Sequence, residues 1–290
     1  MSNALLELAR VTKSFSVGGL FGRSHFNAVD DVSFTVQAGR PEILAIIGES
    51  GSGKTTLARM ILNTLAPTGG AIRFRGEDLR TVRGRKRRLD FIRHIQPILQ
   101  NPYEAFNPLK RVDRYLYASA VRLAGARSQK ARDETADAAL QKVGLSLAEV
   151  KGRFPHELSG GQLQRAAIAR ALISSPTLIV ADEPVSMVDA SLRMSIVNLF
   201  KRLHDELQAS ILYITHDLAT AYYISDRVMI MQKGTVVETG PAREVLTHPQ
   251  HPYSILLKES VLSPDDVGRN RLLASASGGT PARGDARENV

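Results

Sequence analysis

The sequence predicts an α/β fold, in which short buried strands form a sheet and helices cover its faces. Residues 42–47 are a nearly continuous apolar run that leads into a glycine, as a buried parallel strand does. Residues 55–65 follow with apolar side chains at helical spacing and stop before Pro67. The apolar runs 178–181 and 211–215 each end in polar residues, at the edge where an open α/β sheet places its ligand. These observations predict a ligand site at the carboxyl ends of several strands.

Further strands are predicted on both sides of this core. Residues 5–15 and 32–36 alternate loosely between apolar and polar side chains, and residues 71–75 are a third candidate. Residues 228–231 and 235–238 flank a Lys-Gly pair, which predicts a hairpin with glycine in its turn.

The middle of the chain is predicted to be helical. Between residues 111 and 154 the sequence becomes polar, with an alanine-rich helix at 132–143 that Gly144 is suited to end. We expect this stretch to be an insertion between two halves of the core, which resumes with a helix over 163–172. The segment 264–290 has little apolar content, and we expect it to be disordered.

Composition limits the classes of function. The 290 residues suffice for one large domain and a smaller attachment, and the absence of cysteine excludes disulfides and cysteine-ligated zinc or iron–sulfur centres. No apolar run approaches the roughly 18 residues that a membrane-spanning helix needs. Residues 1–10 lack the apolar core of a signal peptide, so we expect a cytoplasmic protein.

The net charge of +9 has one local source, which we call the basic segment, residues 80–93. Its cations are Arg80, Arg83, Arg85, Lys86, Arg87, Arg88 and Arg93. The segment is either a solvated face or a contact for anionic lipid headgroups or an acidic partner loop. Aromatic residues do not alternate with these charges as a base-stacking surface requires, which disfavours nucleic acid as a partner.

A glycine-rich motif lies between the first buried strand and its helix. We call it the P-loop; it comprises Gly48, Glu49, Ser50, Gly51, Ser52, Gly53, Lys54 and Thr55, and Thr56 follows it. Its glycines let backbone amides turn toward phosphate, and the helix N-terminus adds a positive dipole. Lys54 is expected to reach the β- and γ-phosphates of a nucleoside triphosphate, and Thr55 to ligate Mg²⁺. A glycine turn of purely structural origin is the alternative, which the complete match disfavours.

Two carboxylates follow the strand at 178–181. Asp182 is placed to hold Mg²⁺, and Glu183 is the candidate base that polarises an attacking water. Neighbouring residues of a strand point in different directions, so the two carboxylates can serve different roles. An acidic pair at a strand end is otherwise a turn or a helix cap, and the upstream P-loop favours the functional interpretation.

Two further polar side chains lie at predicted strand ends. His216 closes the next strand and is a candidate to hydrogen-bond the γ-phosphate. Gln100 lies where the sheet gives way to the helical insertion, and its neutral amide is suited to touch Mg²⁺ or water. Each residue is weak evidence for a nucleotide site by itself, since a lone histidine, for example, is more often structural.

A second glycine-rich motif, which we call the signature loop, precedes the helix at 163–172. It reads Leu158-Ser159-Gly160-Gly161-Gln162. Together with the P-loop, Gln100, Asp182, Asp189 and His216, it makes the chain resemble the nucleotide-binding subunit of an ABC transporter over residues 5–260. The glycines and the helix dipole suit this loop to an anion.

The resemblance implies a P-loop NTPase core, a mixed sheet with an antiparallel β-subdomain, plus a helical subdomain insertion. The expected domains are the RecA-like core at 1–110 and 155–245, the helical subdomain at 111–154, a C-terminal extension at 246–263 and the tail at 264–290. ATP and Mg²⁺ are the expected cofactors.

The resemblance also implies roles for single residues. Ser159, Gly160, Gly161 and Gln162 are expected to face the γ-phosphate of ATP held by a second cassette, and Asp189 belongs to the loop that contacts that cassette. Phe15 maps to the aromatic residue that stacks on adenine, with plain core as the alternative. Asn101 and the Ser186-Met187-Val188 stretch depart from the usual family pattern, which leaves details of the dimer contact open.

A narrower resemblance is to the cassettes of oligopeptide and dipeptide importers. It rests on Phe154-Pro155-His156-Glu157, on Gln100-Asn101-Pro102-Tyr103, and above all on His248-Pro249-Gln250-His251-Pro252-Tyr253. The chain resembles the second, shorter cassette of such a pair. The resemblance implies a peripheral ATPase on the cytoplasmic face of the inner membrane, which powers solute import.

The partners that this resemblance implies are a second ATP-binding subunit, giving a heterodimer, two transmembrane permease subunits and, indirectly, a periplasmic or extracellular solute-binding protein. A cassette of the carbon–phosphorus lyase type, or an importer of sugar or metal, remains the alternative. Cassettes that act on nucleic acid carry a long coiled-coil insertion, cysteine zinc modules or two cassettes in one chain, and this sequence shows none of these.

Overall fold

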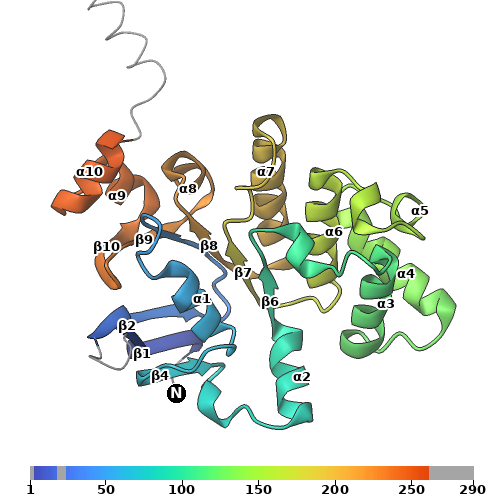
Figure 1. The fold of residues 1–290 in the computed structure, drawn as a ribbon, viewed down its shortest axis with the longest axis horizontal. Helices are drawn as coiled ribbons and strands as arrows, with labels where there is room; N and C mark the ends of the chain where they lie inside the picture. The colour runs from blue at the N-terminus through green and yellow to red at the C-terminus, as the bar shows by residue number, and fades with distance from the viewer. Residues whose placement is uncertain (1–2, 18–23, 261–290) are drawn as a thin grey trace, which may run out of the picture.

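The computed structural model describes residues 3–17 and 24–260, and its centre is a mixed six-stranded sheet in the order β10-β9-β3-β8-β7-β6 (Figure 1). Its strands are β3 (Ile43–Ile47), β6 (Ile95–Ile98), β7 (Leu178–Asp182), β8 (Ser210–Thr215), β9 (Arg227–Gln232) and β10 (Thr235–Pro241). All neighbours pair in parallel except β9 and β10, which form the predicted hairpin. Every residue of β3 and β8 is buried, which explains their continuous apolar sequences.

A second, antiparallel sheet in the order β2-β1-β4-β5 carries the N-terminal strands. Its strands are β1 (Ala4–Val17), β2 (Ser24–Gln37), β4 (Gly69–Phe74) and β5 (Glu77–Asp78). Apolar residues of this sheet share one buried cluster with α1 (Lys54–Ile61) and with one face of the central sheet. The P-loop helix therefore lies between the two sheets, which confirms the predicted mixed sheet with an antiparallel β-subdomain.

The helical part of the chain lies beside the β6 edge of the central sheet, and its apolar side chains share a buried cluster with residues on the other face of that sheet (Figure 1). Its helices are α3 (Val112–Leu123), α4 (Gln129–Lys142), α5 (Leu147–Val150) and α6 (Gly160–Leu172). Ser128 caps α4 by accepting the Ala131 N–H at 3.1 Å, and Gly144 follows it with φ +73°. The predicted helix and its stop at Gly144 are confirmed.

The helix after the P-loop is shorter than its apolar pattern predicted. We expected it to run to Leu65, but α1 ends at Ile61 and Asn63 adopts φ +54°. The amides of Thr64 and Leu65 instead donate to the carbonyl of Arg59, which closes the helix with a left-handed turn. The apolar pattern extends past the end of α1 because Leu65, in the loop that follows the helix, also packs against the core.

The remaining helices connect these elements or follow them in the chain. They are η1 (Leu79–Thr81), α2 (Arg85–His94), η2 (Pro102–Ala105), η3 (Pro155–Glu157), α7 (Ala190–Leu207), α8 (Leu218–Ile224), α9 (Ala242–Thr247) and α10 (Pro252–Ser260). Within the described residues, no helix has the length and apolar character to cross a membrane. The segment 264–290, for which we expected disorder, and the last residues of the expected extension lie outside the described ranges.

Candidate functional site

The P-loop joins the buried end of β3 to the start of α1, and two of its glycines are required by close backbone neighbours. A Cβ on Gly48 would lie 2.3 Å from the carbonyl oxygen of Met231 on β9. A Cβ on Gly53 would lie 2.2 Å from the carbonyl oxygen of Ala28 on β2, and Gly53 also has φ +104°. The backbone of both sheets therefore packs closely against this loop and restricts its conformation.

Lys54 is folded into the loop that it follows. Its Nζ donates to the carbonyl oxygens of Gly48 and Glu49, both at 2.7 Å, and to the hydroxyl of Ser52 at 3.3 Å. The side chain is only 5% exposed, and burial lowers the pKa of Lys54, although the Glu183 and Asp182 carboxylates act in the opposite direction. The ammonium group is thus held at the centre of the loop.

Other members of the motif differ in how far they are exposed. Ser52 is buried, Thr56 is half-buried, and Glu49, Ser50, Gly51 and Thr55 are exposed at the surface of the loop. The backbone of Ser52 is held from outside, because its carbonyl accepts the N–H of Gly234 in the β9–β10 turn at 3.0 Å. The carbonyl of Gly234 in turn accepts the N–H of Asp30 on β2 at 2.8 Å.

The ends of three adjacent strands bring three predicted residues together. Gln100 follows β6, Glu183 follows β7 and His216 follows β8. The Gln100 amide donates to Glu183 Oε2 at 3.1 Å, and His216 Nδ1 lies 3.1 Å from Glu183 Oε1. One carboxylate therefore bridges two side chains that the sequence separates widely.

Glu183 has an unusual backbone. Its φ is +45°, in the left-handed region that glycine favours, and its N–H donates to the carbonyl of Ile214 on β8 at 2.9 Å. Strained residues of this kind gather at functional sites because the surrounding structure must hold them. Here the Glu183 carboxylate contacts Gln100 and His216, whereas that of Asp182 contacts Thr55.

Asp182 faces the P-loop. Its Oδ1 lies 3.5 Å from the hydroxyl of Thr55, at the first turn of α1. Burial raises the pKa of Asp182, which the hydrogen bond from Thr55 opposes and the nearby Glu183 carboxylate reinforces. A hydroxyl and a carboxylate thus offer two adjacent oxygen donors beside the expected phosphates.

Metal binding at this place depends on those oxygens. Among residues 3–17 and 24–260, no group of three or more His, Asp or Glu side chains gathers as a protein metal site. Mg²⁺ needs few protein ligands when phosphates and water supply the rest, and it prefers hard oxygen donors. Thr55 and Asp182 fit that requirement, whereas the Gln100 amide nitrogen is directed at Glu183.

The signature loop is built as an exposed helix N-terminus. Ser159 Oγ accepts the Gln162 N–H at 3.2 Å, and Gln162 Oε1 accepts the Ser159 N–H at 3.1 Å. Ser159 and Gly160 are exposed, while a Cβ on Gly161 would lie 2.9 Å from Leu192. Figure 1 shows α6 on the far side of β7 and β6 from α1, so the structure does not bring the signature loop to the P-loop of its own chain.

Two further residues that the resemblance singled out are both accessible to solvent. Asp189 is exposed and precedes α7, where its carbonyl accepts the Leu192 N–H at 2.9 Å. Phe15 on β1 is half-buried and stacks on Phe26 of β2, with ring centroids 5.8 Å apart. Phe26 is 50% exposed, so the pair forms an accessible aromatic surface and not part of the buried core.

Sequence reasoning missed some residues of the site. Phe26 has no motif of its own, and only the register of β1 against β2 places it opposite Phe15. Gln164 is fully buried in α6, and its Nε2 donates to the carbonyl of Pro184, which follows Glu183, at 2.8 Å. A polar residue within an apolar helical stripe was the available signal for Gln164.

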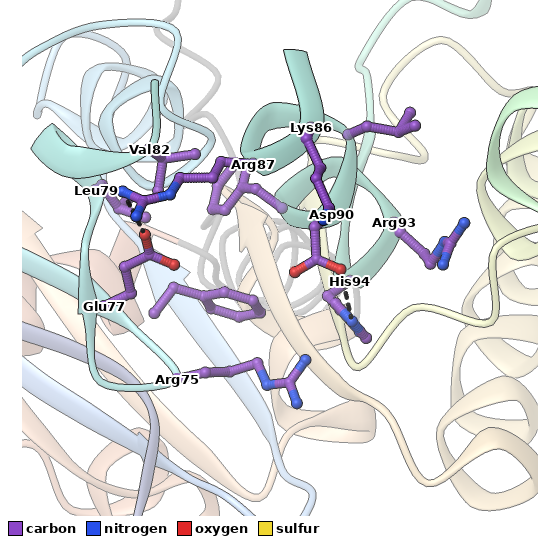
Figure 2. A pocket seen from close by; sticks show the side chains of 12 residues that line it. Arg75, Glu77, Leu79, Val82, Lys86, Arg87, Asp90, Arg93 and His94 are labelled. Atoms are coloured by element: carbon purple, nitrogen blue, oxygen red, sulfur yellow. Dashed lines mark ion pairs between the residues drawn. The ribbon is translucent and has the colours of Figure 1, made fainter. Parts of the chain in front are cut away.

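Part of the basic segment lines a separate hollow. Its helix α2 borders a hollow of about 690 Å³ that the structure lines with Arg75, Lys86 and Arg93 among others (Figure 2). Arg87 pairs with Glu77 at 3.6 Å, and His94 lies 3.8 Å from Asp90. Burial lowers the pKa of His94. None of the sequence-predicted site residues lines this hollow.

Comparison with known families and proteins gives consistent results. The profile of the family described as ABC transporter matches residues 29–186, and that described as oligopeptide/dipeptide transporter, C-terminal region, matches residues 237–288. The oligopeptide transport ATP-binding protein OppF of Bacillus subtilis is 40% identical over 273 residues, which cover 94% of this chain and 87% of that protein. The oligopeptide transport ATP-binding protein AmiF of Streptococcus pneumoniae is 37% identical over 267 residues, covering 92% and 84%.

A solved structure agrees with the fold. The ATP-binding cassette MJ0796, described as a dimer in a post-hydrolysis state bound to ADP and Pi, superposes with a TM-score of 0.72 at 27% identity. The match covers 82% of this chain and 99% of that one.

Proposed function

The chain belongs to the ABC transporter family as an ATP-hydrolysing cassette, and we propose that it powers the import of oligopeptide-like solutes as one of two ATP-binding subunits of a transporter. The observation that carries the proposal is the Glu183 carboxylate, held between Gln100 and His216. The peptide class is supported by the names of the relatives and by the matched C-terminal region. The carbon–phosphorus lyase, sugar and metal alternatives are not favoured by these relatives.

The P-loop binds the phosphates of ATP in this proposal. Backbone amides from Gly51 to Thr55 and the N-terminus of α1 supply hydrogen-bond donors and positive potential. Lys54 exchanges its bond to the Glu49 carbonyl for bonds to phosphate oxygens, which are stronger because both partners are charged. Phe15 and Phe26 offer the adenine ring a stacking surface.

Thr55 and Asp182 would hold Mg²⁺, with Gln100 near it. When bound, the ion neutralises charge on the phosphates. The raised pKa of Asp182 shows that burial makes its ionised form costly, so a divalent ion next to it would favour ionisation.

Glu183 orients and polarises the attacking water in the proposed reaction. Its carboxylate suits that role because it contacts Gln100 and His216 and is separate from the Asp182 contact with Thr55. His216 is 60% exposed at its side chain and can contact the γ-phosphate from the open side of the site. Lys54 stabilises the charge that develops on the transferred group.

A second cassette completes the site. Ser159 and Gly160 are exposed at the start of α6, a helix that lies across β7 and β6 from α1 (Figure 1), so their amides are available to ATP held by a partner. The similarity to MJ0796, a cassette solved as a dimer, supports such a pair. We propose a heterodimer, as the narrower resemblance implies.

A groove between the core and the helical part offers a docking place for the permease subunits. It measures about 810 Å³ and is lined by α1, α2, β6, η2 and α6, with Gln100 and Asp182 in its wall. An element of the permease seated there would touch Gln100 directly. Because Gln100 donates to Glu183, movement of the permease would be coupled to the position of the Glu183 carboxylate. The proposed location, peripheral at the cytoplasmic face of the membrane, follows from this partner.

Replacement of Glu183 tests the proposal. Glu183→Gln keeps the shape of the side chain and removes its basicity, so the steady-state ATPase rate of the assembled complex is expected to fall at least about 100-fold. ATP binding persists, and the ATP-bound pair of cassettes becomes longer-lived in gel filtration. Glu206→Gln, on the exposed face of α7, is the matched control.

A near-normal ATPase rate in the Glu183→Gln complex would exclude Glu183 as the base. Failure of the wild-type chain to co-purify with co-expressed permease subunits would contradict the transporter role.

A further inference from the structure

The C-terminal extension returns to the nucleotide-binding end of the central sheet. Residues 248–253 leave α9 and enter α10, and Figure 1 shows both helices beside β9 and β10. The carboxylate of Glu238 on β10 accepts the N–H groups of Gln250 and His251, at 2.9 and 3.1 Å. His251 Nδ1 accepts the N–H of Tyr253 at 3.2 Å. This network fixes the first turn of α10 against the sheet.

The aromatic ring of Tyr253 is buried by this arrangement. Tyr253 is 5% exposed and belongs to the apolar cluster that includes Ala45 and Ile47 of β3 and Ile230 of β9. The two β3 residues lead directly into the P-loop. The ring is therefore held in place from both the extension and the sheet.

The hydroxyl of Tyr253 reaches the first peptide of the P-loop. It accepts the N–H of Glu49 at 3.1 Å. The same peptide unit carries the carbonyl of Gly48, which accepts Lys54 Nζ at 2.7 Å. One end of the peptide is thus held by the extension, and the other end by the lysine that is to contact phosphate.

This double attachment fixes how the peptide is turned. Rotation about its long axis would break both hydrogen bonds together. Without Tyr253 Oη, the Glu49 N–H would lose its partner at a part-buried position, and the Gly48 carbonyl would be free to tilt. The position of Lys54 Nζ depends on that carbonyl.

We propose that Tyr253 is a positioning residue for the nucleotide site, through which the C-terminal extension sets the affinity of the P-loop for ATP. The proposal deepens the ATPase function proposed above and rests on it. Tyr253 acts through the Gly48–Glu49 peptide and does not touch the nucleotide.

The proposal makes the coupling reciprocal. If a well-seated extension favours nucleotide binding, then bound nucleotide must favour the seated extension by the same factor. Loosening the seat without altering the ring is therefore expected to weaken ATP binding as well, and Glu238→Ala does this by removing the acceptor for two backbone amides.

The test measures Mg-ATP affinity of the full-length chain, at a temperature where every variant is folded. Tyr253→Phe keeps the ring and removes the hydroxyl, and we expect its Kd to rise about two- to tenfold, the value of one hydrogen bond. Tyr223→Phe is the matched control. Tyr223 lies on α8, away from the P-loop, and its hydroxyl donates to Asn198 of α7 at 2.7 Å. Hydrogen exchange at the Glu49 amide is expected to accelerate in Tyr253→Phe and not in the control.

A combined variant separates positioning from general stability. Glu238→Ala is expected to raise the Kd less than Tyr253→Phe, and the double variant to match Tyr253→Phe alone, since both act through one contact. For Tyr253→Phe, the ATPase rate at saturating ATP in the assembled complex is expected to fall by a smaller factor than the Kd rises, because bound phosphate then helps to hold the Lys54 ammonium group.

The outcomes distinguish the two levels of the proposal. A Kd for Tyr253→Phe equal to that of Tyr223→Phe, whatever its melting temperature, overturns the positioning role and leaves the ATPase function standing. A wild-type chain that does not bind Mg-ATP overturns both.

Discussion

The P-loop and the signature loop are both glycine-rich and both precede a helix, yet the molecule supports them in opposite ways. The P-loop is held from outside by β2, by β9 and its turn, and by Tyr253, and from inside by Lys54. The hydrogen bonds that cap the signature loop are local, between Ser159 and Gln162. The difference supports the proposal that the P-loop binds nucleotide within its own chain, whereas the signature loop serves a partner.

The largest expected effect is on the nucleotide that the P-loop binds within its own chain. Lys54→Ala removes two charge-assisted contacts to phosphate, and we expect the ATP affinity of the purified chain to fall at least about 100-fold. Isothermal titration with Mg-ATP measures this loss. Lys110→Ala, at an exposed loop position, is the control and retains wild-type affinity. Unchanged binding by Lys54→Ala would show that the buried ammonium serves the loop alone.

The next largest effect is expected at the ATP site of the partner cassette, which the signature loop is proposed to contact. A Cβ on Gly160 meets nothing within 4 Å in the chain, so Gly160→Asp fits without a clash. Its carboxylate would repel the partner's phosphates, and we expect the ATPase rate of the assembled pair to fall about 10- to 100-fold while the isolated chain keeps its own ATP affinity.

The control for Gly160→Asp is Gln129→Asp, which adds a carboxylate at the first residue of another helix, α4. It is expected to leave the ATPase rate unchanged. Weaker ATP binding by isolated Gly160→Asp would mean that the signature loop serves its own chain, and the contrast between the loops would fail.

The smallest effect concerns stability inside the P-loop site. Burial raises the folded-state pKa of Asp182 above its ordinary 3.8, so the folded state binds this proton more tightly than the unfolded state does. The ionised carboxylate therefore reduces stability as pH rises through the folded pKa, and the cost is absent below pH 3.8, where both states are protonated. The ionised Asp182 carboxylate thus costs folding stability at this place.

Asp182→Asn relieves that cost. Without nucleotide or Mg²⁺ at pH 7, we expect a melting temperature about 2–4 °C higher than wild type, with the gain shrinking as pH falls toward the folded pKa. Asp133→Asn provides the opposite control, because a hydrogen bond from Tyr117 lowers the pKa of Asp133 and its ionised form stabilises the fold. A lower melting temperature for both variants at pH 7 would contradict this cost.

Much of this architecture could be predicted from local sequence. The apolar run before Gly48, the carboxylates after β7 and the hairpin glycine each carry their signal within a few residues. The end of α1 could not be predicted, because the left-handed turn at Asn63 overrode an apolar pattern that continued to Leu65. Apolar spacing reports which side chains are buried, and a loop residue can be buried too.

The unpredicted parts of the site depend on pairing between distant segments. Phe26 joins Phe15 only through the register of β1 and β2, and Tyr253 meets Glu49 only through the path of α10 across the sheet. Neither relation has a spacing that the sequence displays. The roles of the site residues stay predictions, among them those of Gln100, Phe15 and Asp189.

The bond between Glu49 and Tyr253 has a consequence for how the protein is made. Their positions are 204 apart in the chain, and at about 5–20 residues per second a ribosome takes about 10–40 s to cover that separation. The Gly234 turn, which holds Ser52, also arrives late. The earliest motif to be translated is therefore among the last to be completed, and a nascent cassette gains its finished nucleotide pocket only when its C-terminal helices have folded back.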